Sequence, residues 1–263
     1  MGDEHIAKEV HSLIGYLEWV KRELGDGEWV FRGQCNSQWK LLPSIARPDA
    51  SVDPAKAQEK LVRELKLRLP SVYQRNLHDD WELLALAQHH GAPTSLLDWS
   101  RSSLVALWFA VSENARLQSA TDAAVWAFRV EDADFVTEKQ RESTSPFEVQ
   151  KTCFFESKYF DNRLAAQQGI FSVHKWWGPG ERVIPLDGNK NLSDRLKKFV
   201  IQKDDLVSVV KDLLQAGIGA ATLFPDLEGL CKHILIKHRL APKKIFEDVN
   251  DGVNFSDSSS TQS

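Results

Sequence analysis

Three short segments place polar side chains beside a glycine, inside runs of apolar residues that are typical of strands. They are residues 29–34 (Trp-Val-Phe-Arg-Gly-Gln), residues 88–99 (Gln-His-His-Gly-Ala-Pro-Thr-Ser-Leu-Leu-Asp-Trp) and residues 162–171 (Asn-Arg-Leu-Ala-Ala-Gln-Gln-Gly-Ile-Phe). A buried arginine, imidazole or amide is costly unless it has a partner. We therefore expect the three segments to form the walls of one site.

The first segment predicts an anion-binding position. Arg32 is flanked by apolar residues, so its guanidinium must meet a buried carboxylate, a carbonyl or a ligand phosphate. A planar donor fork suits a pyrophosphate, whereas the alternative is an internal salt bridge with Asp98. Gly33 allows close approach of a backbone, and Gln34 completes the predicted nucleotide-binding group.

The second segment contains adjacent histidines before a Gly-Ala-Pro turn. Adjacent side chains cannot both point the same way, so we expect one to be structural and the other, His90, to donate to a ribose hydroxyl or carry a proton. The alternative is a pair of hydrogen-bonded histidines at a helix C-terminus. A metal site would need a third ligand, which no His-Xaa-His or Cys-Xaa-Xaa-Cys pattern supplies, so we expect no metal.

The end of this segment adds a carboxylate and two hydroxyls. Asp98 lies in an apolar stretch and is expected to be buried, either orienting an arginine (Arg32, Arg101 or Arg163) or acting as a general base. Thr94 and Ser95 can bond a ribose or cap the turn.

The third segment supplies an arginine and an amide. Arg163 and Gln168 flank a short alanine stretch that leads into a strand. Glutamine cannot act as a general base, but it can hold a ribose hydroxyl or polarise a water. Several tryptophans outside the apolar helical runs are candidates for stacking on a base, with core packing as the alternative; they are Trp39, Trp81, Trp176 and Trp177.

Composition limits the class of protein. The chain has 263 residues, 42% of them hydrophobic, and a formal charge of −4, so no overall positive field attracts nucleic acid or a membrane. Its three cysteines are far apart, and no long apolar run or signal-peptide pattern is present. We expect a cytoplasmic protein with reduced thiols and no membrane partner.

Hydrophobic periodicity predicts the elements that must position these groups. Helices are expected over residues 6–23, 56–69, 79–91, from 102 or 103 through 111, 206–214 and 225–235, with a cap at Asp204 for the fifth and Pro225 in the first turn of the last. Strands are expected over residues 29–34, 122–130, 169–174 and 198–201. We therefore predict one α+β domain over residues 1–247, with a mixed, bent sheet and flanking helices, and a disordered tail over residues 248–263.

The three segments together resemble the FRG domain family, a largely bacterial group named for the Phe-Arg-Gly found here at residues 31–33. Residues 41–44, 160–163 and 224–230 also fit, so the resemblance extends from about residue 10 to residue 240. One position departs from the pattern, because the family usually has arginine where this chain has Ser95.

The resemblance implies a function. FRG proteins are often found near toxin–antitoxin and phage-defence genes and look distantly similar to ADP-ribosyltransferases, which implies an ADP-ribosyltransferase-like core. By that analogy Arg32 fixes NAD, Thr94 and Ser95 form the second strand, and Gln168 takes the place of the late glutamate.

The combined prediction is a defence or toxin effector that binds NAD or a related nucleotide and transfers ADP-ribose to a protein or nucleic-acid acceptor, with an antitoxin or defence-system partner. We predict that Arg32, Gly33, Gln34, Thr94 and Ser95 bind the cofactor and that catalysis uses His90, Asp98, Arg163 and Gln168. The alternatives are a metal-independent RNase toxin and a non-catalytic nucleotide sensor.

Overall fold

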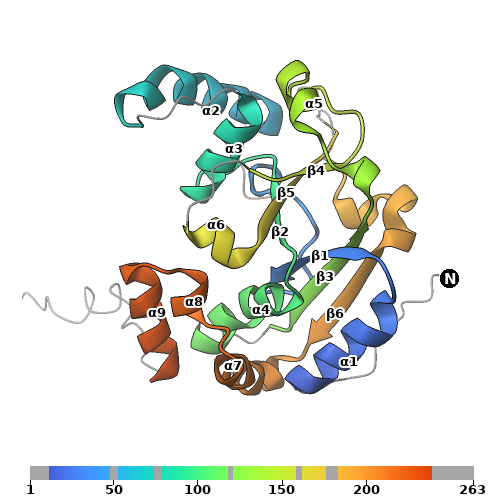
Figure 1. Cartoon of the computed structure of the whole chain (residues 1–263), viewed down its shortest axis with the longest axis vertical. Coiled ribbons are helices and arrows are strands. Elements are labelled where there is room, and N and C mark those ends of the chain that lie inside the picture. Colours follow the sequence, from blue (N-terminus) through green and yellow to red (C-terminus); the bar gives the residue numbers. More distant parts are fainter. Residues whose placement is uncertain are drawn as a thin grey trace, which may run out of the picture.

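A six-stranded antiparallel sheet in the order β4-β5-β2-β1-β3-β6 forms the centre of the fold (Figure 1). The computed structural model describes residues 12–47, 53–73, 79–117, 121–157, 162–175 and 183–238. The strands are β1 (Glu28–Gln34), β2 (Leu97–Ser100), β3 (Ala123–Val130), β4 (Cys153–Phe155), β5 (Gly169–Val173) and β6 (Leu196–Ile201). The α+β class is confirmed, and the sheet expected to be mixed is antiparallel in each of its five strand pairings.

The sheet is weakest at its middle. β1 pairs with β3 through seven residue pairs and β2 pairs with β5 through four, but the register between β1 and β2 contains the single pair Phe31 and Ser100. Beyond that pair the two central strands no longer form a ladder, so the halves β4-β5-β2 and β1-β3-β6 separate. Main-chain groups that leave a ladder need other partners, which makes this point suitable for side-chain or ligand contacts.

Helices cover the sheet in two groups (Figure 1). α1 (Leu13–Leu24), α4 (Ser103–Leu117) and α7 (Leu206–Gln215) share a core with β1, β3 and β6. α2 (Pro54–Arg68) and α3 (Asp80–His89) pack with β4 and β5 in a second core. The remaining helices are α5 (Glu138–Ser143), α6 (Asn162–Gln167), α8 (Ala220–Leu223) and α9 (Leu227–Lys237).

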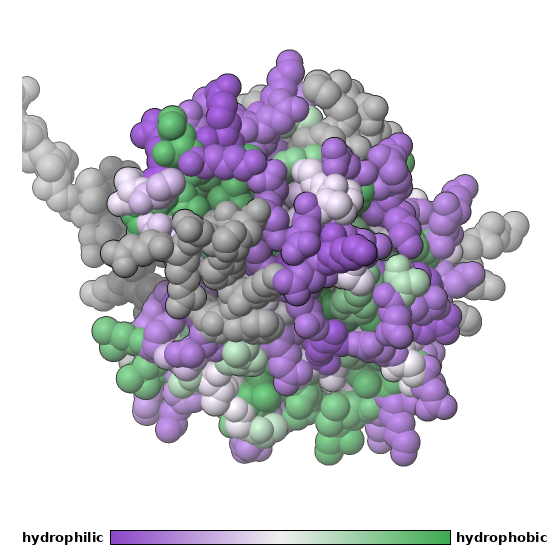
Figure 2. Space-filling view, turned by 45° about the horizontal axis from the view of Figure 1, so that its top comes forward, coloured by the Kyte–Doolittle hydropathy of each residue, from purple (hydrophilic) through white to green (hydrophobic). Residues whose placement is uncertain are grey.

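Strand alternation assigns residues to the two faces. Phe31 and Val125 belong to the core under α4, while Val30, Trp99 and Phe128 belong to a third core on the opposite face. The loop residues Leu41, Leu186 and Leu192 complete this third core. On the face in Figure 2, hydrophilic side chains predominate and apolar ones gather along its lower edge.

Most predicted elements are present within the described residues, with shifted ends. Ser12 caps the first helix through the main-chain nitrogen of Gly15, and the predicted start at residue 6 lies outside the described residues. Two predicted helix starts are wrong. Helix α7 follows Asp205 without a side-chain cap, so Asp204 does not cap it. Helix α9 begins at Leu227 after the capping Asp226 carboxylate, so Pro225 precedes the helix and does not lie in its first turn. The predicted tail over residues 248–263 also lies outside the described residues.

Five short α-helices and strands do not follow from periodicity, and β2 among them is central. These elements, β2, β4, α5, α6 and α8, span three to six residues, which is too short for periodicity to identify. Most apolar residues of α4 are buried, although Phe109 keeps 37% exposure. No helix within the described residues combines the length and apolarity needed to cross a membrane.

Candidate functional site

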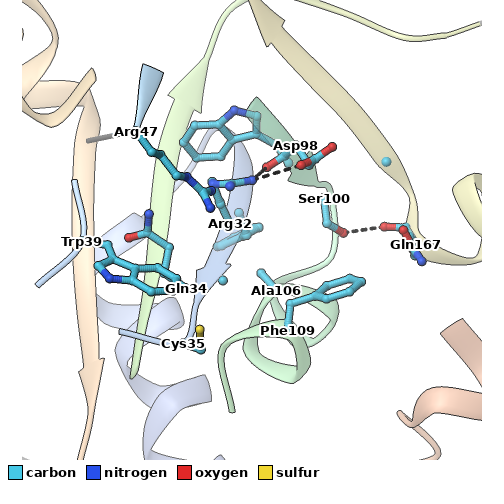
Figure 3. Close-up of a pocket in the computed structure, with 14 residues that line it drawn as sticks. Arg32, Gln34, Cys35, Trp39, Arg47, Asp98, Ser100, Ala106, Phe109 and Gln167 are labelled. Atoms are coloured by element: carbon cyan, nitrogen blue, oxygen red, sulfur yellow. Dashed lines mark hydrogen bonds and ion pairs between the residues drawn. The ribbon is translucent and has the colours of Figure 1, made fainter. Parts of the chain in front are cut away.

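A cleft of about 270 Å³ opens where β1 and β2 separate (Figure 3). Its walls come from β1, β2, the start of β5, one side of α4 and the loop that follows β1. The polar and aromatic residues that line it are Phe31, Arg32, Gln34, Cys35, Trp39, Arg47, Asp98, Trp99, Ser100, Phe109 and Gln167. The first two predicted segments therefore meet here, and the third reaches the cleft through its glutamine.

Arg32 spans the gap between the two strands. Arg32 Nη1 donates to the main-chain oxygen of Asp98 at 2.7 Å and lies 3.4 Å from Asp98 Oδ2. The Arg32 side chain is only 13% exposed, and its Nε has no hydrogen-bond partner among the described residues. Burial lowers the pKa of the guanidinium, opposed by the attraction of Asp98. The salt bridge with Asp98, which the sequence offered as the alternative to a ligand, is therefore present. It leaves the Arg32 Nε donor without a partner among the described residues.

Gly33 sits where β1 contacts α4. A Cβ at this position would overlap the main-chain oxygen of Ala106 and lie 2.6 Å from the main-chain nitrogen of Ala110. The glycine therefore lets α4 lie directly against the strand, which brings Phe109 to the edge of the cleft. Close packing of two backbones is one of the uses of glycine predicted from the sequence.

Gln34 lines the cleft, but its amide already has partners in the protein. Its Oε1 accepts from Trp126 Nε1 at 2.8 Å, and its Nε2 donates to the main-chain oxygen of Lys40 at 3.3 Å. These bonds hold the loop that follows β1 against the sheet. Trp39 and Arg47, which belong to the segment after β1, form the outer wall of the cleft, with the guanidinium 5.8 Å from the indole centroid (Figure 3).

Asp98 is exposed, contrary to the expectation that its apolar neighbours would bury it. Its side chain is 58% exposed, whereas Leu97 and Trp99 are buried, because alternate residues of β2 face opposite sides of the sheet. The Asp98 carboxylate accepts hydrogen bonds from Arg32 and from Gln88 Nε2. Asp98 therefore presents a carboxylate to the cleft in a fixed position.

A second hollow of about 180 Å³ adjoins the cleft and shares Asp98 and Gln167 with it. Its other lining residues are Gln88, His89, Arg163, Leu164, Phe171 and Phe224. The rings of Phe224 and Phe109 meet edge to face at 5.9 Å, so α4 and the segment before α9 are in contact. Asp98 is the one carboxylate among the described residues that line either hollow.

Arg163 lines the second hollow and not the cleft around Arg32. Its Nε lies 2.5 Å from Asp226 Oδ2, its Nη2 lies 2.8 Å from Glu228 Oε2, and its guanidinium stacks over the Phe224 ring. The hydrogen bonds that Arg163 donates to these carboxylates raise its pKa. The sequence pattern did not anticipate these partners, which come from α9 and its N-cap.

The histidine pair lies at the C-terminus of α3, as expected. His89 is the last residue of the helix and lines the second hollow, whereas His90 is exposed and lines neither hollow. Their rings meet edge to face with centroids 5.1 Å apart. His89, and not the predicted His90, therefore borders the hollow that Asp98 also lines.

Thr94 and Ser95 are buried in the turn before β2 and line neither hollow. The main-chain nitrogen of Thr94 donates to Ser44 Oγ at 3.1 Å, and that of Ser95 donates to Gln58 Oε1 at 2.8 Å. These contacts favour the predicted turn role over direct ribose binding. The departure from the family pattern at Ser95 thus lies outside the lining of both hollows.

Gln168 occupies a turn, and its side chain is exposed outside both hollows. It has a φ of 47°, a left-handed conformation that ends α6 and starts β5. The adjacent Gln167 lines both hollows, donates to the main-chain oxygen of Leu223 at 3.1 Å and accepts from Ser100 at its main-chain oxygen. The structure therefore brings Gln167 to the cleft in the place predicted for Gln168.

A half-buried imidazole, that of His174, lies near Arg32. His174 Nε2 is 3.2 Å from Ser172 Oγ and its Nδ1 is 3.3 Å from Thr152 Oγ1, while Ser172 Oγ also accepts from Trp99 Nε1 at 2.8 Å. Burial, and to a smaller extent the charge of Arg32, lower the His174 pKa to about 4. The imidazole is therefore neutral at pH 7 and adds no charge beside Arg32.

Several cleft residues were missed by sequence reasoning. Arg47, Phe109 and Gln167 are ordinary members of a loop, a buried helix and a short helix, and only tertiary packing brings them together. The sequence did indicate Trp39, because it is a tryptophan outside the apolar helical runs. Its side chain lines the cleft and is 47% exposed. Trp81 is instead buried and donates to the main-chain oxygen of Thr144, and the other two stacking candidates lie outside the described residues.

The cleft carries an excess of positive charge. Arg32 and Arg47 face the one carboxylate of Asp98, and within the described part of the chain no carboxylate lies within salt-bridge distance of Arg47. Burial raises the pKa of the Cys35 thiol, so this cleft cysteine stays protonated and adds no negative charge. The described residues contain no group of three or more histidine, cysteine or acidic side chains able to hold a metal ion. The chemistry offered by the cleft is anion binding beside aromatic rings.

Residues 27–119 match the family model of the FRG domain. This segment runs from β1 to the end of α4 and supplies most of the cleft, including the arginine and the carboxylate. A comparison with curated proteins and one with solved structures each find no match. The resemblance expected from the sequence is confirmed for this segment, and the ADP-ribosyltransferase-like core is not.

Proposed function

We propose that the FRG domain at residues 27–119 builds the phosphate-binding wall of a nucleotide site and that the ligand is NAD or a related dinucleotide. The observation that supports this most directly is Arg32, whose buried guanidinium has an unpartnered Nε beside the cleft. Guanidinium groups bind phosphate oxygens through paired hydrogen bonds, which would satisfy donors that Asp98 leaves unused.

The outer wall of the cleft suits the rest of a nucleotide. The exposed Arg47 adds a second positive charge near Arg32, and the half-exposed rings of Trp39 and Phe109 offer surfaces for stacking a base. Any base can stack on an aromatic ring, so these two rings support a nucleotide as the ligand without selecting one particular base.

The dimensions support a ligand that extends over both hollows. The cleft volume of about 270 Å³ is near the lower end of the roughly 300–1,000 Å³ typical of small-molecule sites. The second hollow continues from it past Asp98 and Gln167. In this arrangement a pyrophosphate at Arg32 places the adjoining ribose near the shared carboxylate.

The reaction we propose for this site is ADP-ribose transfer to a cellular macromolecule. The bond between ribose C1 and the nicotinamide nitrogen breaks, its electron pair leaves with nicotinamide, and an acceptor nucleophile forms the new bond to C1. Positive charge develops on the ribose in the transition state, and the Asp98 carboxylate is the group that would stabilise it and then take the acceptor's proton. A role as a toxin or defence effector in the cytoplasm, with an antitoxin or defence partner, belongs to the same proposal.

Binding and transfer are tested separately. We expect calorimetry to show NAD binding by the wild type, and Arg32→Gln to weaken it at least tenfold, a loss of about 1.4 kcal/mol. The matched variant Arg22→Gln removes an exposed arginine on α1 and should leave the affinity unchanged. No NAD binding by the folded wild type, or equal binding by Arg32→Gln, would refute the proposal.

Labelled NAD then tests the transfer step. Label on a protein or nucleic acid, together with nicotinamide release that Asp98→Asn abolishes, is the expected result. RNA cleavage that persists without NAD and is lost in His90→Ala would instead favour an RNase, and binding without turnover would favour a sensor.

A further inference from the structure

We infer that Gln88 and Thr94 are positioning residues for the Asp98 carboxylate, forming a relay of hydrogen bonds from the turn before β2 to the cleft. This inference rests on the proposed function, in which that carboxylate stabilises charge on the ribose. Gln88 belongs to the last turn of α3, Thr94 is fully buried in the turn, and Asp98 lies in β2, so the relay joins three parts of one short segment.

The relay begins with the fixed main chain of Thr94. Its nitrogen donates to Ser44 Oγ at 3.1 Å, and its oxygen accepts from the main-chain nitrogen of Ile45 at 3.3 Å. Thr94 Oγ1 accepts from the main-chain nitrogen of Leu96 at 3.2 Å. A hydroxyl has one proton, and with Oγ1 acting as acceptor toward Leu96 that proton is directed to Gln88 Oε1.

This proton fixes the orientation of the Gln88 amide. Because Oε1 accepts from the Thr94 hydroxyl, the amide nitrogen must point the other way, where it donates to Asp98 Oδ1. The reversed amide would place an oxygen against the carboxylate, where two acceptors repel each other, and would leave the Thr94 hydroxyl proton without Gln88 as its acceptor. The favoured arrangement therefore has a donor facing Asp98.

Asp98 is consequently held at both carboxylate oxygens. Oδ1 accepts from Gln88 and Oδ2 faces Arg32 Nη1 at 3.4 Å, although more than half of the side chain is exposed. An exposed carboxylate without such contacts samples several rotamers, and displacement of a reacting group by about 1 Å can cost on the order of 100-fold in rate. The relay keeps the carboxylate at the junction of the two hollows.

The sequence spacing fits this role. Gln88 is six residues before Thr94 and ten before Asp98, and the C-terminus of α3 with its Gly91 turn folds the chain back so that all three meet. Gln88 also lines the second hollow, so the same amide that holds the carboxylate borders the space beside it. Neither Gln88 nor Thr94 needs to touch the ligand for this function.

The test compares variants that break one link of the relay at a time. Gln88→Met keeps the length of the side chain and removes the donor, and Thr94→Val keeps the shape and removes the hydroxyl. Thr94→Ser retains the hydroxyl and should restore the wild-type behaviour. Gln150→Met is the matched control, because Gln150 is an exposed glutamine that lines neither hollow.

Steady-state nicotinamide release provides the first measurement. For Gln88→Met we expect kcat to fall at least tenfold while KM for NAD stays within twofold, and for Thr94→Val a smaller fall in the same direction. A purely structural role would lower stability and affinity together, without a selective fall in kcat. Unchanged kcat in Gln88→Met, or equal losses in Thr94→Ser and Thr94→Val, would overturn the inference.

The second measurement does not depend on turnover. In protein labelled with ¹³C at aspartate carboxyls, the Asp98 signal, assigned with Asp98→Asn, should shift in Gln88→Met and Thr94→Val and not in Thr94→Ser or Gln150→Met. An Asp98 signal that is identical in Gln88→Met and wild type refutes the relay. Absence of NAD turnover in the wild type together with the expected shifts would refute the proposed transfer reaction while leaving the relay intact.

Discussion

Replacing the half-buried imidazole of His174 with an amide should remove a large part of the acid sensitivity of this protein. The imidazole lies near Arg32, bonded to Ser172 and Thr152, and its pKa falls from 6.5 to about 4 through burial and the nearby charge of Arg32. Between these two values the unfolded chain binds a proton that the folded protein excludes. Stability is therefore fully present above pH 6.5 and is lost as the pH falls toward 4.

The magnitude follows from the two pKa values. A difference of one pKa unit corresponds to about 1.4 kcal/mol, so His174 should destabilise the folded protein by about 2 kcal/mol at pH 5 and about 3 kcal/mol at pH 4, relative to pH 7. The variant His174→Gln retains an amide for the two hydroxyl contacts and has no proton to gain. It should be less stable than wild type at pH 7, but its stability should change less with pH.

The assay is urea unfolding followed by tryptophan fluorescence at pH 7, 6, 5 and 4, with the slope m checked for constancy. Asp134 and Asp226 also have lowered pKa values and weaken the fold in acid, but they are common to both proteins and cancel in the difference. His90→Gln removes an exposed imidazole and serves as the control. If wild type and His174→Gln lose stability in parallel, within about 0.5 kcal/mol, the reasoning on His174 is wrong.

Two further predictions concern packing and a buried charge pair. Gly33→Ala should destabilise the protein by about 1–3 kcal/mol, because the new Cβ would overlap the main chain of α4. The control Gly188→Ala should change stability much less, because its Cβ would make only ordinary van der Waals contacts. Calorimetric melting compares the two variants, and equal effects would contradict the prediction. Glu82→Ala should cost about 3–5 kcal/mol in urea unfolding, because it leaves the buried Arg141, 2.7 Å from Glu82 in the native protein, without that compensating charge. The exposed pair on α2 provides its control, since Glu64→Ala should cost under about 1 kcal/mol, and a similar cost for both would show that the buried pair is not special.

The long elements could be predicted because their sequence patterns are local. Apolar residues at helical spacing identified α1, α2, α3, α4 and α7, and the strand residues of β1 and β3 alternate or cluster with turn signals at their ends. Glycines that follow α1 and α7 are stop signals of the same local kind, since Gly25 and Gly217 both have positive φ values. These features depend on the energies of neighbouring residues and need no knowledge of the rest of the fold.

The candidate site could be predicted only in part. The sequence indicated that Arg32 and Asp98 needed partners, and the structure pairs them. It did not indicate that Asp98 would be exposed, since the exposure depends on where β2 lies in the sheet and which face each residue takes. The functional roles assigned to the cleft residues stay predictions.

What the sequence alone determined is which residue types require partners and which segments form the main helices and strands. Only the tertiary structure decided which partners they find, because the separation of β1 from β2 places Arg32 against a main-chain oxygen, and the left-handed turn at Gln168 brings Gln167 to the cleft in its place. Likewise, Arg163 is neutralised by carboxylates from α9 more than sixty residues later. The physical reason is that burial and hydrogen-bonding demands are set by each side chain, whereas their satisfaction depends on distances between segments far apart in the chain.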